Sequence, residues 1–188
     1  MLKMIMNLMD VEGLEEGKLL PALEPVDAAD LVRRTLQETE VAAQQKKVSL
    51  ALDAAGPVWI EADPALLRRV VDNLLTNAIS KSPAGGRVTA VVLMREEGGE
   101  IAISDEGAGI PEEYRESIFE KYSQVGNKRH GESNNRGLGL TFCRLAIESQ
   151  GGTIWADEAQ AGGARFRMIL PATLHPRERE LVGAAVEA

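Results

Sequence analysis

Cysteine, aromatic residues and long apolar runs are scarce in this sequence of 188 residues. The single cysteine, Cys143, excludes an intrachain disulfide framework and is typical of a reducing compartment. No apolar run is long enough to cross a bilayer, and no secretory signal pattern is present. We therefore expect a cytoplasmic location and no membrane contact by this chain, although a full-length parent could be membrane-anchored.

Positive charge is also in short supply, since 21 Lys and Arg residues face 29 Asp and Glu residues and give a formal net charge of -8. A surface that neutralises the phosphates of a nucleic acid needs excess cations, so we expect no nucleic-acid partner. A small polyphosphate needs only a local positive site and is not excluded. The length and the 44% hydrophobic content suit one domain with one core.

Hydrophobic periodicity and the placement of Gly and Pro predict helices alternating with short strands. Helices are predicted over 1–12, 27–46, 64–82, 111–121 and 137–150. Strands are predicted over 48–52, 58–60, 88–94, 100–105, 153–156 and 165–170. Asp27 and the pair Asp63-Pro64 are the expected starts of two of the helices. We expect an α+β fold, a two-layer α/β sandwich whose mixed sheet is covered by helices on one face.

Two asparagines stand out in the predicted helix 64–82. Asn73 and Asn77 are four residues apart, so they lie on one edge of the helix beside its apolar stripe. Asparagine is a poor residue for a helix interior because its side chain competes for backbone hydrogen bonds. Their amide oxygens would suit a ligand or a hard cation such as Mg²⁺. The alternative is a solvated polar edge without function.

Asp105 ends a strand in which it shares a face with Ile101 and Ile103. A carboxylate on an apolar face is costly unless it is hydrogen-bonded, and Gly107 and Gly109 follow, where a ligand can approach the backbone closely. A buried Asp that accepts a hydrogen bond from an exocyclic amine would read adenine. The alternative is a turn residue that caps its own loop.

A glycine-rich junction opens the predicted helix 137–150 with Gly137, Leu138, Gly139 and Leu140. Free backbone N–H groups and the helix dipole favour an anion at such an end, so phosphate binding is one interpretation and a tight loop-to-helix junction is the other. The polar stretch before it has the composition of a lid that closes on a triphosphate, although most charged loops are merely solvated. Its cations are Lys128, Arg129, His130 and Arg136.

Other nucleotide and metal motifs are missing. The sequence contains no GxxxxGK[ST] loop and no GxGxxG after an early strand. One cysteine and two separated histidines, His130 and His175, do not make a metal site.

Four segments in order closely resemble the N, G1, F and G2 boxes of histidine-kinase catalytic domains, within the ATPase superfamily that includes Hsp90, DNA gyrase and MutL. They are NLLTNAISKS (73–82), DEGAGI (105–110), IFEKYSQ (118–124) and GLGL (137–140). The resemblance covers about residues 1–171. It implies a Bergerat-type ATP-binding fold over 21–171, preceded in 1–20 by the end of a dimerisation helix and its linker. Residues 172–188 are expected to be a frayed tail.

The resemblance also implies roles for particular residues. Asn77 would ligate Mg²⁺, with Asn73 supporting it, and Asp105 would read the adenine amino group. Ile110 and Phe119 would form the apolar wall and the lid anchor. The remaining implied nucleotide contacts are Gly107, Gly109, Lys128, Arg129, Gly137, Leu138, Gly139 and Leu140. The implied reaction transfers the ATP γ-phosphoryl to a histidine of a separate dimerisation domain and then to an aspartate of a response-regulator receiver domain.

This sequence departs from the family pattern at two points. Ser80 and Lys81 stand where the family usually has Lys and then Tyr, so Lys81, Lys128, Arg129 or Arg136 would have to supply the phosphate-facing charge. Neither histidine resembles the family's phosphoacceptor, so the chain should bind ATP without carrying its own acceptor. The departure at Ser80 keeps open a nucleotide-binding scaffold without phosphotransfer. A serine kinase that inhibits a sigma factor is a third option, disfavoured by the F-box segment.

Overall fold

The computed structural model describes residues 2–121, 138–160 and 162–176. Its larger sheet has the strand order β2-β4-β5-β7-β6. The strands are β2 (Ser49–Asp53), β4 (Arg87–Arg95), β5 (Gly98–Ser104), β6 (Thr153–Glu158) and β7 (Ala164–Leu170). The β2–β4 pair is parallel and the other three pairs are antiparallel, so the sheet is mixed as predicted.

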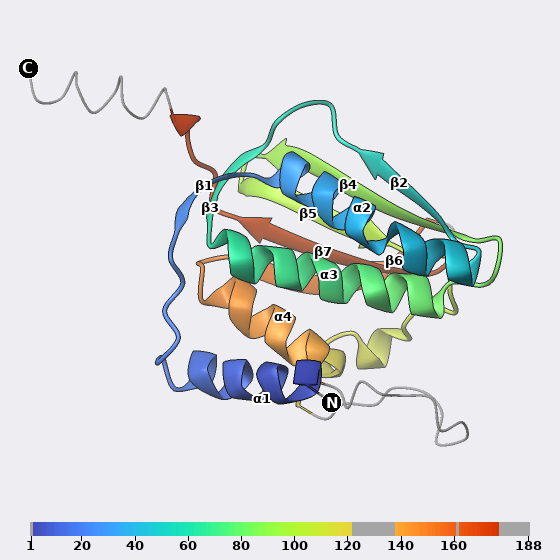
Figure 1. The fold of residues 1–188 in the computed structure, drawn as a ribbon, viewed down its shortest axis with the longest axis horizontal. Coiled ribbons are helices and arrows are strands. Elements are labelled where there is room, and N and C mark those ends of the chain that lie inside the picture. Colours follow the sequence, from blue (N-terminus) through green and yellow to red (C-terminus); the bar gives the residue numbers. More distant parts are fainter. Residues whose placement is uncertain (1, 122–137, 161, 177–188) are drawn as a thin grey trace, which may run out of the picture.

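Helices cover one face of this sheet and complete the predicted two-layer α+β sandwich (Figure 1). They are α2 (Ala28–Lys46), α3 (Pro64–Lys81) and α4 (Gly139–Glu148), with α3 packed between the other two. α1 (Leu2–Glu15) packs against α4 at the outer side of this layer. Among the described residues, no helix is long and apolar enough to span a membrane.

The starts of α2 and α3 follow the chemistry expected from the sequence. Asp27 caps α2 by accepting from Ala29 N at 3.0 Å, and Asp63 caps α3 by accepting from Ala65 N at 2.9 Å. Each carboxylate satisfies backbone N–H groups that have no partner inside the helix. The buried Gln150 accepts from Asp63 N at 2.7 Å, which fixes the end of α4 against the start of α3.

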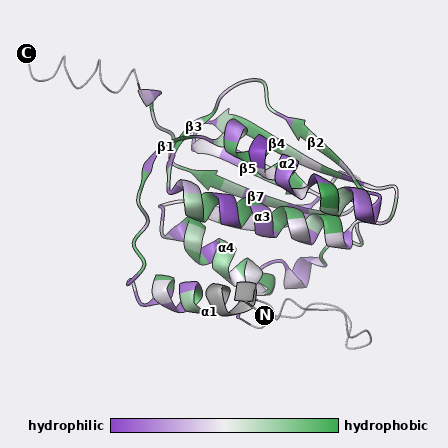
Figure 2. Ribbon diagram, viewed as in Figure 1, coloured by the Kyte–Doolittle hydropathy of each residue, from purple (hydrophilic) through white to green (hydrophobic). Residues whose placement is uncertain are grey.

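The core lies between the helical layer and the sheet. Val70, Val71, Leu74 and Leu75 of α3 are fully buried, as are Ile101 and Met168 of the sheet or nearly so. In Figure 2, α2 and α3 alternate between hydrophobic and hydrophilic residues, as expected of helices with one buried side. The aliphatic core agrees with the scarcity of aromatic residues in the sequence.

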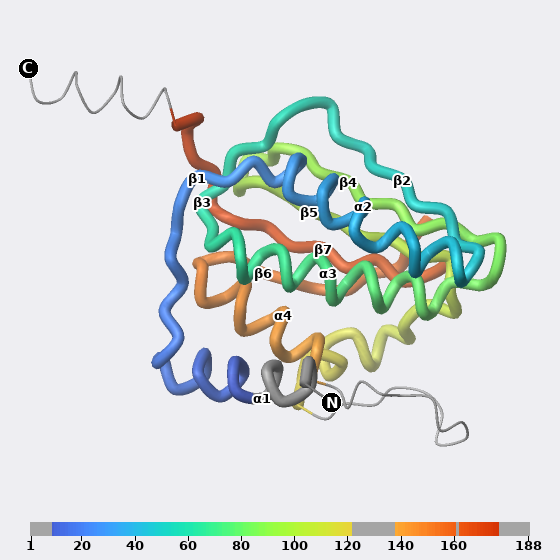
Figure 3. The backbone as a smooth tube through the Cα atoms, in the orientation of Figure 1, coloured from blue at the N-terminus to red at the C-terminus, as the bar shows by residue number. Residues whose placement is uncertain are grey.

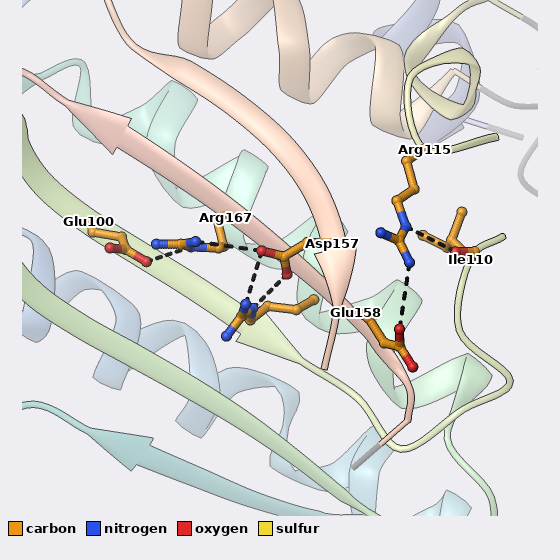
Figure 4. A network of polar contacts seen from close by, with 7 residues as sticks. Glu100, Ile110, Arg115, Asp157, Glu158 and Arg167 are labelled. Atoms are coloured by element: carbon orange, nitrogen blue, oxygen red, sulfur yellow. Dashed lines mark hydrogen bonds and ion pairs between the residues drawn. The ribbon is translucent and has the colours of Figure 1, made fainter. Parts of the chain in front are cut away.

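The opposite face of the sheet carries a network of charges around Glu100 (Figure 4). The side chain of Glu100 accepts from Arg95 Nε and Arg167 Nε, both at 2.8 Å, and Arg167 Nη1 also lies 3.5 Å from Asp157 Oδ2. The hydrogen bond from Arg167 is the main cause that holds the pKa of Glu100 below its ordinary value. Glu100 is 4% exposed, yet both of its carboxylate oxygens have partners.

Three expectations about local structure were wrong. The segment 111–121 forms two 3₁₀ turns, η1 (Glu112–Tyr114) and η2 (Ser117–Phe119), because its only buried apolar residues are Ile118 and Phe119 and no amphipathic stripe supports a helix. β1 (Glu24–Asp27) was missed because Pro25 suggested a break, but proline is tolerated on an edge strand. It pairs with β3 (Trp59–Ala62) in a separate sheet. α1 also continues past Gly13.

The chain after β7 runs beside the small sheet, as the tube in Figure 3 shows. Ala172 forms a bridge with Ile60, Thr173 N donates to Trp59 O at 3.0 Å, and the ring of His175 meets that of Trp59 edge-on at 4.8 Å. The first residues of the segment 172–188, expected to fray, therefore have defined contacts.

Candidate functional site

The two asparagines of α3 lie on the side of this helix that meets α4. Asn73 is 7% exposed, and Asn77, one turn further on, is half-buried. A methyl group added to Gly139 would stand 3.7 Å from Asn73 Oδ1, so this amide oxygen faces the first turn of α4. Asn73 is therefore not part of a solvated edge, and it lies beside the glycine-rich helix start.

Asp105 follows β5 directly and is 4% exposed. Its Oδ1 accepts from Gly107 N at 2.8 Å and from Ala164 N at 3.2 Å, while Oδ2 accepts no hydrogen bond from the residues that the structure describes. Burial is the main cause that raises the pKa of Asp105, and the two backbone N–H groups and the charge of Lys81 oppose it. The carboxylate is thus largely buried, and both of its backbone partners bind the same oxygen.

The turn between β6 and β7 forms the floor beneath this carboxylate. A methyl group on Gly163 would stand 1.9 Å from the backbone oxygen of Asp105, so only glycine fits there. Gly109, whose φ is +72°, lies against the same turn, since a methyl group there would be 3.2 Å from Gly162 O. The sequence interpretation missed Gly163 and Ala164 as site residues, although a glycine pair before an alternating strand was a visible signal.

Gly107 and the end of α3 close the other side of the Asp105 carboxylate. A methyl group on Gly107 would stand 2.8 Å from the Lys81 carbonyl oxygen and 2.9 Å from Asp105 Oδ1. Glycine at this position therefore lets the loop approach the last turn of α3. Lys81, suggested from the sequence as a phosphate-facing cation, lies at the Asp105 end of the helix.

The apolar candidates border the same loop. Phe119 is 2% exposed, meets Phe166 edge-on at 6.2 Å and is covered by the guanidinium of Arg144 at 4.6 Å. Ile110 is half-buried against the core, and its carbonyl oxygen accepts from Arg115 Nε at 3.2 Å (Figure 4). Phe119 thus packs the turn η2 onto the core, and its role as a lid anchor stays a prediction.

The first turn of α4 carries Leu138, Gly139 and Leu140. Leu138 is buried and, as the residue before the helix, makes no side-chain capping bond. Such an end is suited to an anion. The predicted contacts Lys128, Arg129, Arg136 and Gly137 lie outside the described residues.

The structure therefore brings most of the predicted positions to one region along α3. Asn73 and Gly139 mark one end of this region, and Asp105, Gly107 and Lys81 mark the other. Within the described part of the chain, no group of three His, Cys, Asp or Glu residues could hold a metal ion. A cation here would depend on amide oxygens and on ligand oxygens.

The chain is similar to known proteins along most of its length. Residues 62–174 match the family described as "Histidine kinase-, DNA gyrase B-, and HSP90-like ATPase". The adaptive-response sensory kinase SasA of Rippkaea orientalis is 35% identical over 89% of this chain and 44% of that protein. The ATP-binding domain of PrrB from Mycobacterium tuberculosis is 30% identical over 81% of this chain and 98% of that chain, with a TM-score of 0.65. The mycobacterial sensor histidine kinase MprB is 28% identical over 82% of this chain and 100% of that chain, with a TM-score of 0.68.

The matched family region contains α3, the loop after β5, α4 and β7, so every described site residue falls within it. The chain spans less than half the length of the curated relatives it matches, for example 12% of the hybrid signal transduction histidine kinase D of Dictyostelium discoideum. The likeness therefore concerns one domain of longer proteins.

Proposed function

The chain belongs to the family of histidine kinase-, DNA gyrase B- and HSP90-like ATPases, and on that premise we propose that it is the ATP-binding catalytic domain of a two-component sensor histidine kinase. It would bind Mg·ATP and support attack by a histidine nitrogen on the γ-phosphorus, with ADP as the leaving group. The phosphoryl group would then pass to an aspartate of a receiver domain.

The observation that carries this proposal is the half-satisfied carboxylate of Asp105. Two backbone N–H groups occupy Oδ1, and Oδ2 is left to accept from a ligand. An exocyclic amine such as that of adenine is the donor such an acceptor selects, and a dry site makes a missing partner costly. Gly107, Gly109 and Ile110 would line the ring, and Phe119 would anchor the wall beside it.

We assign the magnesium ion to the asparagine edge. Mg²⁺ prefers oxygen ligands in octahedral geometry and usually keeps several waters and phosphate oxygens. The half-buried Asn77 would supply an amide oxygen, with Asn73 behind it and facing α4. The bound ion would neutralise charge on the phosphates, while the chain's own residues hold the nucleotide in place.

The phosphates would lie at the first turn of α4. The N-cap residue Leu138 offers this turn no side-chain acceptor, and Gly139 leaves the space in front of Asn73 open. Leu138 and Leu140 would fix this turn against the core. Lys128, Arg129, Arg136 and Gly137 remain proposed contacts from outside the described residues.

The proposed partners are a histidine-bearing dimerisation domain and a response-regulator receiver domain. We propose that residues 1–20 form the end of that dimerisation helix and its linker, and that 21–171 form the catalytic domain. Asp10 of α1 pairs with Arg69 at 2.6 Å, and Val11 is fully buried, so α1 packs as part of the same body. The acceptor histidine would come from the dimerisation domain, since His175 packs on Trp59.

Calorimetric titration tests nucleotide binding directly. We expect the chain to bind ATP in Mg²⁺ more tightly than in EDTA, and Asn77→Ala to reduce the difference between the two conditions. Thr89→Ala, on the helix-free face of the sheet, serves as the control variant. No ATP binding by the wild-type chain under either condition would refute the proposal.

A nucleotide-binding scaffold without phosphotransfer is the second candidate. The exposed Ser80 favours it, because a short hydroxyl stands where the family usually has a phosphate-facing lysine. Mixing the chain with its histidine-bearing half and γ-labelled ATP separates the two. Phosphohistidine formation supports the kinase, whereas ATP binding without label transfer supports the scaffold.

A further inference from the structure

Strand β2 lies at one edge of the larger sheet, and no described strand pairs with its outer side (Figure 1). Ser49 N donates at 2.9 Å to the carbonyl oxygen of Gly86, directly before β4. Successive residues of a strand point their N–H and C=O groups to alternate sides, so those of Leu50 and Leu52 point away from β4. These groups offer hydrogen bonds to one more strand.

The sequence of β2 leaves this edge open to pairing. Edge strands are commonly protected by proline, by lysine or by a bulge. The strand Ser49–Asp53 contains neither proline nor lysine, and its register with β4 is continuous. Its one charged residue, Asp53, stands at the end of the strand. The strand can therefore accept a partner along its length.

An open groove of about 310 Å³ lies beside this edge, between β2 and α2. Leu50 and Leu52 line the groove from the strand, and Leu36 lines it from the helix. Leu50 and Leu52 pack against the core but are only half-buried. Burial of their remaining apolar surface would stabilise a complex with any chain that pairs with β2.

Charges of opposite sign border the groove. Arg33 and Glu40 line it from exposed positions of α2 that are about 10 Å apart along the helix axis. Asp30 lies 3.4 Å from Arg33 but 2.7 Å from Arg34, so Arg33 is the more distant of its two partners. Glu40 accepts a hydrogen bond from Gln44 at 3.2 Å and forms no ion pair with the residues that the structure describes. Arg33 and Glu40 can therefore each take a further partner of opposite charge.

We propose that β2 pairs with β2 of a second copy of this chain, antiparallel about a two-fold axis at Ala51. In this register Leu50 lies opposite Leu52 of the second copy, and their outward groups exchange both N–H···O bonds. Ser49 lies opposite Asp53, so the two Asp53 carboxylates are kept apart. The larger sheets of the two copies then form one continuous sheet. The described residues of the nucleotide site lie on α3, on α4 and after β5, outside this interface.

The same two-fold axis pairs the charges of the groove. In Figure 1, α2 and β2 run in opposite directions, so Glu40 lies toward the start of β2 and Arg33 toward its end. An axis perpendicular to the sheet keeps α2 of both copies on the same face. Arg33 of each copy then faces Glu40 of the other. A surface that carries its own complement fits a second copy, because an interface with two-fold symmetry joins each patch to itself.

Sedimentation equilibrium over a concentration series tests the pairing. The chain of 20.3 kDa should be monomeric when dilute and dimeric when concentrated, with a Kd of roughly 10–100 μM, because a small interface is weak. Arg33→Glu and Glu40→Arg each place like charges opposite one another, so each should raise the Kd by about tenfold. Glu112→Arg, at an exposed position of η1, is the matched control and should dimerise as the wild type does.

Restoring the charge pattern gives the sharper result. The double variant Arg33→Glu/Glu40→Arg should dimerise as the wild type does, and a mixture of the two single variants should form heterodimers. Amide hydrogen exchange locates the interface. The amides of Leu50 and Leu52 should exchange more slowly in the concentrated wild type than in concentrated Arg33→Glu.

Three results would overturn this proposal. A wild-type chain that stays monomeric up to about 1 mM has no such interface. A dimer that the single variants do not weaken forms through another surface. A double variant that does not regain the wild-type Kd shows that Arg33 and Glu40 do not face each other. Circular dichroism of each variant checks that its fold is intact.

Discussion

Two buried acids on the same strand region behave in opposite ways. Glu100 and Asp105 are each 4% exposed, and they lie within and directly after β5. Arg95 and Arg167 satisfy both oxygens of Glu100 and lower its pKa, whereas burial raises the pKa of Asp105, whose bonds fall on one oxygen. Both oxygens of Glu100 have partners within the protein, and we propose that a ligand supplies the donor for the second oxygen of Asp105.

This difference shows why burial alone does not identify a functional acid. A buried carboxylate with two guanidinium partners stabilises the face on which it lies. A buried carboxylate whose backbone donors all bind one oxygen keeps its second oxygen as an acceptor. This arrangement lowers the stability of the fold, but it leaves an acceptor for a ligand.

Gly163→Ala should have the largest effect, because Gly163 packs directly against the backbone of Asp105. The new methyl group would lie 1.9 Å from the carbonyl oxygen of Asp105 and 2.6 Å from its carbonyl carbon, and these backbone atoms cannot move aside easily. We expect a loss of about 3 kcal/mol in the free energy of unfolding, together with loss of ATP binding. Denaturant unfolding and calorimetry measure the two effects. Gly56→Ala, where a methyl group meets nothing within 4 Å, should change neither.

Asp105→Asn should separate binding from stability. The amide oxygen can still accept from Gly107 and Ala164, but the amide nitrogen would then face the adenine amine as a second donor. We expect ATP affinity to fall by at least about 100-fold while the free energy of unfolding stays level or rises. Asp53→Asn, at the exposed end of β2, is the control. Equal ATP affinity in Asp105→Asn and wild type would show that this carboxylate does not recognise the adenine amine.

Glu100→Gln should give the opposite pattern. Loss of two charge-assisted hydrogen bonds should lower the free energy of unfolding by about 1–2 kcal/mol and leave ATP affinity unchanged. Glu112→Gln, at an exposed position in η1, is the control and should have no effect. A clear loss of ATP affinity in Glu100→Gln would mean that the two faces of the sheet are coupled.

The pH dependence of stability should be the smallest effect, with opposite signs at the two acids. The lowered pKa of Glu100 adds stability that is present above its usual value of 4.5 and is lost as pH falls through the lowered pKa. The raised pKa of Asp105 makes ionisation costly in the folded state, so its penalty grows as pH rises from 3.8 through the raised pKa. Between pH 3.5 and 7, the destabilisation caused by Glu100→Gln should therefore increase with rising pH. The destabilisation caused by Asp105→Asn should decrease over the same range. Slopes of the same sign would contradict this account.

Local signals were sufficient to predict the elements that carry the site. The pair Asp63-Pro64 marked the start of α3, and the apolar alternation before Asp105 correctly predicted a strand, which ends at Ser104 and is followed directly by the buried acid. These features depend on neighbours in the sequence, and the structure confirms them.

Contacts distant in the sequence were not predictable in the same way. The bond from Ala164 to Asp105 joins residues 59 positions apart and exists only because β5 and β7 pair antiparallel. The order of residues along the site is likewise a tertiary result. It depends on α4 packing beside α3, which puts Gly139 at Asn73 and leaves Lys81 with Asp105.

If Asp105 recognises adenine, its Oδ2 accepts a hydrogen bond from the exocyclic amine of the nucleotide. The most direct measurement is the affinity of the wild-type chain and of Asp105→Asn for Mg·ATP and Mg·inosine triphosphate, which carries a carbonyl oxygen in place of the amine. We predict that the wild type prefers ATP by at least about 100-fold and that Asp105→Asn loses or reverses this preference. Equal affinity of the wild type for both nucleotides would contradict the account.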